Sequence, residues 1–272
     1  MQNYRPFSGI TPAVKTLIIL NVAMYFLATF IEQHYKINVS HLLGLHLPQS
    51  HYWGPWQYVT HMFMHGSISH LFFNMFALFM FGCILESIWG SKRFLIFYFV
   101  CGIGAGALNS AIGWFEIQRL IEQYEQFQLS PNPNILAEVV KHQLSHPAGW
   151  IWETIDNWIN NPQSPEYEAI GKQIFQTIID LKVNVPMIGA SGAIFGILLA
   201  FGMLFPNTEL YLMFIPIPIK AKYFVLGYGF LELYLGFQNN AGDNVAHFAH
   251  LGGMLFGFFL IKYWNRNRKK FY

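Results

Sequence analysis

The sequence predicts an all-α membrane protein built as a bundle of six transmembrane helices. Of its 272 residues, 54% are hydrophobic and only 11% are charged, whereas a typical soluble domain carries about 25% charged residues. Six separate stretches also approach the roughly 20 mostly apolar residues that a helix needs to cross a bilayer. These stretches cover residues 14–31, 68–88, 93–113, 187–205, 221–238 and 244–263.

The basic residues predict how the bundle is oriented. Placing the N-terminus inside puts eleven of the 16 Lys and Arg residues on the inner side, which follows the positive-inside rule. They are Arg5, Lys15, Lys92, Arg93, Lys220, Lys222, Lys262, Arg266, Arg268, Lys269 and Lys270. Six crossings return the C-terminus to this side, so we expect both termini to be cytoplasmic. The lack of a cleavable signal or targeting segment favours a bacterial inner membrane.

The chain divides into four predicted parts. Residues 1–113 hold spans one to three with a long outer loop, 187–263 hold spans four to six, and 264–272 form a basic cytoplasmic tail. Residues 114–186 form an extracytoplasmic insertion between the third and fourth spans, and nine of the 14 acidic residues lie there. Helical spacing interrupted by prolines predicts a lobe of short helices. The net charge of +2 gives no reason to expect a nucleic-acid partner.

Four polar side chains are predicted to share one depth in the outer half of the membrane. Ser191, in "GASGAIFG", lies near the outer end of span four. His70 and Asn74 are four residues apart near the outer end of span two, so they share a helix face. His250 lies about seven residues from Asp243, or roughly 10 Å deep at 1.5 Å per residue. Because polar groups inside spans are costly, this convergence predicts a functional site.

Small residues accompany two of these polar groups. Gly192 and Gly196 are four residues apart in span four, and Gly253 and Gly257 repeat the spacing in span six. Such small-xxx-small patterns let helix backbones approach closely. We therefore expect the serine of span four to come within hydrogen-bonding reach of the histidine of span six.

This combination of residues suits acyl transfer. An imidazole can activate a serine hydroxyl by taking its proton, and the developing oxyanion needs hydrogen-bond donors. A helix that begins at Ser191 would present the unpaired backbone N–H groups of Ser191 and Gly192. The side chains of His70 and Asn74 would supply further donors.

Three acidic residues near the predicted spans are not expected to take part in the reaction. Asp243 belongs to a surface loop, which favours a Ser–His dyad over a triad. Glu232 lies inside span five, where we favour a structural role, either facing water near the site or paired with a loop group. Glu86, near the inner end of span two, is predicted to hold the turn before "WGSKR".

The motifs that contain these residues resemble those of the rhomboid family of intramembrane serine proteases. The matching motifs are "HLFFN" (70–74), "GCILESIWG" (82–90), "GASG" (189–192) and "AHLGGMLFG" (249–257), together with the loop "WQYVTHMFMHGSISH" (56–70). The resemblance implies a rhomboid-like six-helix bundle in the lipid bilayer, transmembrane protein substrates, and neither cofactor nor metal.

The resemblance also implies a role for each site residue. Ser191 would be the nucleophile, His250 the general base, and His70 and Asn74 would join Gly192 in oxyanion and substrate binding. The insertion departs from the family. Phe195 also departs from it, because some members have a tyrosine there that packs on the catalytic histidine.

Several alternatives stay open. His247 competes with His250, but only His250 has the glycine spacing of the family, and His247 would line the entrance. A metal site is not expected, because the histidines lack an H-E-x-x-H pattern, and His61 and His65 would instead orient the outer loop. A non-catalytic rhomboid-like factor that binds membrane proteins is the main functional alternative. A transporter is a third, although the inner halves of spans two, four and six are almost wholly apolar.

Overall fold

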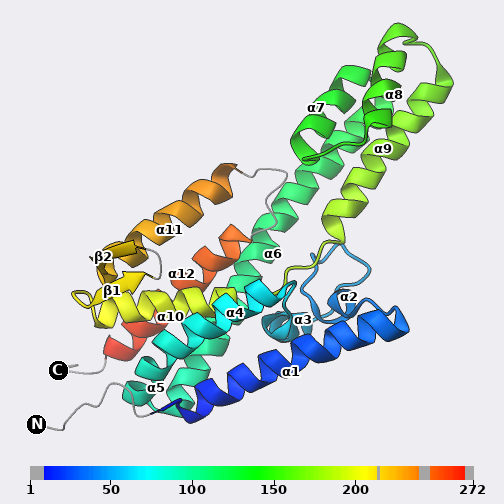
Figure 1. The fold of residues 1–272 in the computed structure, drawn as a ribbon. Helices are drawn as coiled ribbons and strands as arrows, with labels where there is room; N and C mark the ends of the chain where they lie inside the picture. The colour runs from blue at the N-terminus through cyan, green and yellow to red at the C-terminus, as the bar shows by residue number, and fades with distance from the viewer. Residues whose placement is uncertain (1–8, 213–214, 239–245, 267–272) are drawn as a thin grey trace, which may run out of the picture.

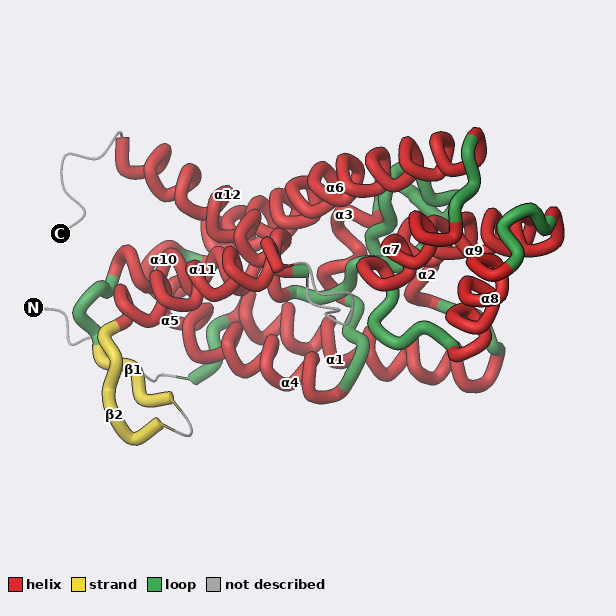
Figure 2. The backbone as a smooth tube through the Cα atoms, turned by 90° about the horizontal axis from the view of Figure 1, so that it is seen from above, coloured by secondary structure: helices red, strands yellow, loops and turns green. Residues whose placement is uncertain are grey.

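A computed structural model describes residues 9–212, 215–238 and 246–266, which form helices and one short hairpin (Figures 1 and 2). In chain order the elements are α1 (Pro12–Tyr35), α2 (Val39–Leu43), α3 (Gln57–Thr60), η1 (His61–Phe63), α4 (Ile68–Ala77), η2 (Leu78–Gly82), α5 (Cys83–Trp89), α6 (Ser91–Leu129), α7 (Pro133–Gln143), α8 (Gly149–Asn160), α9 (Pro165–Val183), α10 (Ser191–Leu204), β1 (Glu209–Leu212), β2 (Ile215–Lys220), α11 (Ala221–Gln238) and α12 (His247–Arg266).

Each predicted span contains a helix among its described residues, but these helices differ in length and hydropathy. Among the described residues, three helical stretches are long and apolar enough to cross a membrane: Pro12–Tyr35, Ile68–Trp89 and Ser91–Leu129. Helix α10 is apolar but has only 14 residues, about 21 Å at 1.5 Å per residue. The structure therefore describes an all-α membrane protein, and the count of six crossings stays a prediction.

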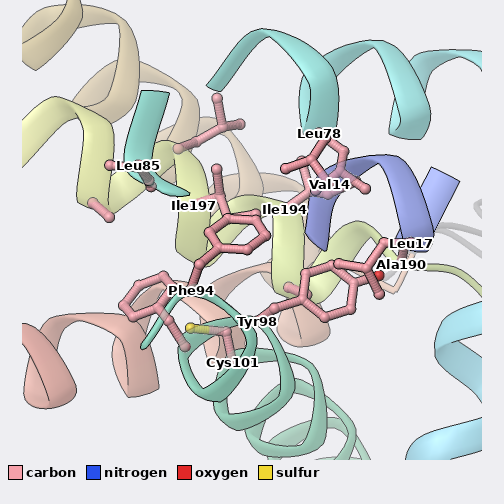
Figure 3. Packing of buried hydrophobic residues seen from close by; sticks show 14 of the residues in the cluster. Val14, Leu17, Leu78, Leu85, Phe94, Tyr98, Cys101, Ala190, Ile194 and Ile197 are labelled. Carbon is pink, nitrogen blue, oxygen red and sulfur yellow. The ribbon is translucent and has the colours of Figure 1, made fainter. Parts of the chain in front are cut away.

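A hydrophobic core joins the helices of the bundle. Figure 3 shows Val14 from α1, Leu78 from η2, Tyr98 and Cys101 from α6 and Ile194 from α10 around one buried space. These side chains are almost fully shielded from solvent. Cys101 packs in this core, and Cys83 is partly buried against it.

Glycines bring α10 and α12 together. The α-carbon of Gly196 lies 3.4 Å from where a β-carbon on Gly257 would stand, and the Gly253 carbonyl oxygen lies 3.0 Å from the equivalent position on Gly196. A β-carbon on Gly253 would overlap the carbonyl oxygen of Gly192, so a larger residue there would push the two helices apart. The close approach predicted from the two small-xxx-small patterns is confirmed.

Helix α6 differs from the sequence prediction. We expected span three to end at 113 and the insertion to begin at 114, but a single 39-residue helix runs from Ser91 to Leu129. No proline interrupts the sequence in this range, and the helix ends at Leu129, two residues before Pro131. The bundle and the lobe therefore share one helix.

The lobe formed by the C-terminal half of α6 with α7, α8 and α9 stands at one end of the molecule (Figure 1). It has its own buried cluster, including Phe127, Trp158 and Phe175, which is separate from the bundle core. The predicted short helices are present in α7 and α8, each preceded by a turn that holds a proline. The start of α1, the end of α12 and the β1–β2 hairpin lie at the opposite end (Figure 1).

The hairpin was not predicted. Strands β1 and β2 pair antiparallel, with Glu209 opposite Lys220. The predicted basic tail lies largely beyond the described residues, as does Asp243.

Glu86 has the structural role that the sequence indicated. It bonds Ser91 at the predicted turn and also the start of α1. Its carboxylate accepts hydrogen bonds from the backbone N–H groups of Ala13 (2.8 Å) and Val14 (2.9 Å) and from the hydroxyls of Thr11 (2.5 Å) and Ser91 (2.6 Å). A carboxylate there satisfies the first amides of α1 and complements its dipole. Glu86 thus ties the start of α1 to the junction of α5 and α6.

Candidate active site

Ser191 is the first residue of α10, as predicted. The preceding Gly189 has φ of +127° and donates its backbone N–H to the carbonyl of His61 (2.9 Å). A β-carbon on Gly189 would lie 2.8 Å from Nε2 of His70, so only glycine suits both this backbone conformation and the neighbouring ring. The "GASG" loop is therefore fixed between the outer loop and α4.

Ser191 and His250 meet across the α10–α12 contact. The Ser191 hydroxyl oxygen lies 2.9 Å from Nε2 of His250, which is within hydrogen-bonding range. On the far side of the imidazole, Nδ1 lies 2.8 Å from Oε2 of Glu232. Because an ionised carboxylate only accepts, Nδ1 carries the proton in the neutral ring. Nε2 is then free to accept the proton of the serine hydroxyl.

Phe195 supports the imidazole, as expected for the residue one turn after the serine. Its ring is stacked on that of His250, with centroids 4.1 Å apart and planes at 6°. Tyr228 of α11 packs against the other side of Phe195, with centroids 4.8 Å apart. The histidine is thus held both by a hydrogen bond and by an aromatic face.

The partners of Glu232 were not predicted from the sequence. It lies in α11, is 3% exposed, and its carboxylate accepts hydrogen bonds from Nδ1 of both His250 and His247 (2.6 Å). Among the described residues its hydrogen-bond partners are these two histidines of α12, and it lines the same cavity as Ser191. His247 is buried as well, so it belongs to this cluster and not only to an entrance.

His70 and Asn74 lie in the same cavity as Ser191. The cavity has a volume of about 1370 Å³, and its wall includes His70, Asn74, Ser191, Glu232 and His250. Nδ2 of Asn74 is buried and has no hydrogen-bond partner among the described residues. The four side chains predicted to share one depth therefore do converge.

Backbone donors are also available in the cavity. The first hydrogen bond within α10 runs from the N–H of Ile194 to the carbonyl of Ala190 (3.1 Å). The N–H groups of Ser191 and Gly192 thus precede the intrahelical ladder. Both residues line the cavity, as Asn74 does.

The outer-loop histidines differ from each other. Nδ1 of His61 hydrogen-bonds the Gln57 carbonyl (2.7 Å), as predicted. Burial lowers the pKa of His61 to about 4, against the opposing effect of that hydrogen bond. His65 packs edge-on against His70, with ring centroids 5.0 Å apart. It therefore supports His70 rather than only the loop.

The cavity extends to the base of the lobe. Glu116 of α6 and Lys182 of α9 both line it. Burial raises the pKa of the Glu116 carboxyl, and the charge of Lys182 opposes that rise. Burial likewise lowers the pKa of Lys182, opposed by Glu116. These two groups interact electrostatically where the lobe joins the bundle.

Comparison with known proteins shows the family to which this chain belongs. The model of the rhomboid domain matches residues 52–114 and 167–266, more than half of the chain. The matched ranges contain Ser191, His250, His70 and Asn74, and residues 115–166 between them are unmatched.

Three curated relatives are similar in sequence. An uncharacterised mitochondrial rhomboid protein of Schizosaccharomyces pombe is 27% identical over 223 residues, which cover 78% of this chain and 52% of the relative. Rhomboid protease AarA of Providencia stuartii is 32% identical over 112 residues, covering 40% of each chain. Rhomboid-like protease 3 of Toxoplasma gondii is 27% identical over 108 residues, covering 38% of this chain and 41% of the relative.

The chain thus spans about half or less of the length of the curated relatives it matches. The family assignment rests instead on the domain match, which covers both the α4 motif and the α10 and α12 motifs. On that match and on the helical membrane fold, this chain belongs to the rhomboid family.

Proposed function

We propose that the protein is an intramembrane serine endopeptidase that cleaves transmembrane segments of other proteins. The observation that carries the proposal is the 2.9 Å separation between Oγ of Ser191 and Nε2 of His250, in a cavity that both residues line. Membership of the rhomboid family and the similarity to proteins named rhomboid proteases support it.

The proposed reaction uses this geometry directly. Oγ of Ser191 attacks the carbonyl carbon of the scissile peptide bond while its proton passes to Nε2 of His250. Donors from the Ser191 and Gly192 amides and from His70 and Asn74 stabilise the tetrahedral oxyanion. His250 then gives the proton to the leaving nitrogen, and water hydrolyses the acyl-enzyme by the same route.

The substrate proposal follows from the shape of the site. The cavity wall combines residues of α4, α10, α11 and α12 with residues at the base of the lobe. A peptide bond inside a regular helix is shielded by its own hydrogen bonds, so a substrate segment must unwind before it can meet Ser191. Transmembrane segments that carry helix-breaking small residues near the cut are the preferred class.

The decisive experiment compares cleavage of a model transmembrane substrate in liposomes by wild type, Ser191→Ala and His250→Ala. We expect both variants to lose at least 100-fold in kcat. Ser87→Ala and His142→Ala serve as matched controls, because Ser87 is exposed and bonds only its own helix carbonyl and His142 is exposed on the lobe. Equal cleavage by all five proteins would overturn the assignment. Folded wild type that binds substrates without cleaving them would favour the non-catalytic binding factor.

The topology is part of the proposal. The start of α1 and the end of α12 lie opposite the lobe (Figure 1), which supports cytoplasmic termini and an extracytoplasmic lobe. In a background without Cys83 and Cys101, Leu129→Cys is expected to react with a membrane-impermeant maleimide from outside intact cells. Lys92→Cys is expected to react only after permeabilisation, and the reverse pattern would invert the topology.

A further inference from the structure

We propose that Glu232 is a positioning residue for His250, so that the site works as a Ser191–His250–Glu232 triad rather than a dyad. This inference rests on the proposed protease function. It starts from a buried carboxylate in α11 whose oxygen Oε2 accepts from two histidines of α12, at 2.8 Å from His250 and 2.6 Å from His247.

Because the Glu232 carboxylate is buried, its hydrogen-bond donors indicate its role. Glu232 is 3% exposed, and a buried carboxylate is stable only when hydrogen-bonded donors replace its water. The two donors that reach it among the described residues both converge on Oε2. His247 therefore fixes the carboxylate from one side and leaves it aimed at Nδ1 of His250.

The same three side chains could in principle bind a metal ion, because their ligand atoms lie within 4.8 Å of one another. Ligands around a tetrahedral zinc ion have bonds of about 2.0–2.1 Å, which places neighbouring ligand atoms roughly 3.3 Å apart. The contacts of 2.6 and 2.8 Å are shorter and have the lengths of charge-assisted hydrogen bonds. The distances favour two N–H donors on one oxygen.

The carboxylate would act on His250 in two ways. It selects the tautomer with the proton on Nδ1, which leaves Nε2 as the acceptor for the Ser191 proton. When Oγ forms its bond to the substrate carbonyl carbon and its proton moves to Nε2, the imidazolium gains an anionic neighbour. Glu232 stays ionised throughout, and the proton leaves from Nε2 to the amine as the C–N bond breaks.

The chain offers a matched control for neutralising this carboxylate. Glu86 is equally buried, at 3% exposure, and also accepts several hydrogen bonds, but it lies at the far end of the bundle core. Glu86→Gln reports the general cost of replacing a buried carboxylate with an amide. Glu232→Asp retains the charge.

The test measures kcat, KM and the pH dependence of kcat/KM on a model transmembrane substrate in detergent. For Glu232→Gln we expect kcat to fall about 10- to 100-fold with KM within twofold. We also expect the acidic limb of the profile to move to lower pH, because the imidazolium loses its counter-charge. Glu232→Asp should keep the acidic limb near that of the wild type, and Glu86→Gln should leave the limb unchanged.

Two results would overturn the triad while leaving the protease proposal intact. One is a Glu232→Gln enzyme with wild-type kcat and an unshifted acidic limb, in a preparation where Ser191→Ala is inactive. The other is loss of activity with a chelator and recovery with zinc, which would assign the cluster to a metal. An inactive wild type would instead contradict the protease function itself.

A second measurement does not need the Glu232 variants to fold. In ¹⁵N-histidine-labelled Ser191→Ala protein, nuclear magnetic resonance reports which ring nitrogen of His250 carries the proton. We expect the Nδ1–H tautomer near neutral pH. The Nε2–H tautomer would overturn the proposal, since a carboxylate at Nδ1 requires a donor there.

Discussion

Gly253 of α12 faces Gly192 of α10 so closely that a β-carbon on Gly253 would overlap the Gly192 carbonyl oxygen. This contact lies one residue after Ser191 and three residues after His250, so it sets the separation of the two side chains. Close packing of the helix backbones is thereby linked directly to the geometry of the site.

Gly253→Ala should therefore damage both the fold and the site. Overpacking typically costs about 1–3 kcal/mol, and any increase in the helix separation lengthens the contact between Ser191 and His250. We expect a lower melting temperature in detergent and labelling by a fluorophosphonate probe that is at least tenfold slower. Gly227→Ala is the control, because nothing lies within 4 Å of a β-carbon there; it should be neutral or stabilising by about 0.5–1 kcal/mol. Wild-type labelling by Gly253→Ala would contradict the link.

Phe195 offers a separate test of how His250 is held. Phe195→Ala removes the stacked ring and leaves a cavity, so we expect kcat to fall about tenfold or more. Phe195→Tyr keeps the aromatic face and should retain most activity. Steady-state cleavage of the model substrate distinguishes the two variants. If the alanine variant cleaved as fast as the tyrosine variant, the ring would be shown to have no role in holding the imidazole.

The lobe has its own core, so its stability should be separable from the site. Trp158 is 1% exposed in that core, and Trp158→Ala is expected to cost about 3–5 kcal/mol of lobe stability. Trp150→Ala, on the same helix but 56% exposed, should cost far less. Hydrogen exchange of α7 to α9 measures the first effect, and probe labelling of Ser191 should stay unchanged. Loss of labelling would mean that the lobe is needed to form the active site.

The lowered pKa of His61 predicts that the free energy of unfolding decreases in acid. Its pKa is lowered to about 4 in the folded protein, against about 6.5 when unfolded. Between these values the unfolded state binds more protons, so the free energy of unfolding falls as the pH drops from 6.5 towards 4. The full shift corresponds to about 3 kcal/mol.

His61→Gln should flatten this dependence, because glutamine keeps an N–H donor for the Gln57 carbonyl but does not titrate. Denaturation at several pH values between 4 and 7 measures the slope, and His142→Gln, at an exposed position of the lobe, provides the comparison. An identical slope in wild type and His61→Gln would rule out His61 as its source.

Much of the site could be predicted because depth follows from counting residues along apolar helices. Ser191, His250, His70 and Asn74 were brought together in this way, and glycine spacing indicated which helices touch. The same count would have found Glu232. It lies six residues before the end of α11 at Gln238, close to the depth predicted for His250 in span six.

Other features had weaker signals. The length of α6 depends on a lack of helix breakers between Ser91 and Leu129, whereas the prediction followed the change from apolar to acidic residues at 114. A helix continues through such a change when its polar half has partners, here Trp158 of α8 and Phe175 of α9. The β1–β2 hairpin was missed because Pro216 and Pro218 obscure the strand pattern of β2.

The continuous helix α6 is much longer than a bilayer is thick. Its 39 residues extend about 58 Å at 1.5 Å per residue, nearly twice the roughly 30 Å hydrocarbon thickness. A rigid helix shared by bundle and lobe holds the lobe at a set height and tilt relative to Ser191. Under the proposed protease function and topology, the outer domain of a substrate would meet the lobe only if its linker has a suitable length, and linker length would then be a criterion of selection independent of the sequence around the scissile bond.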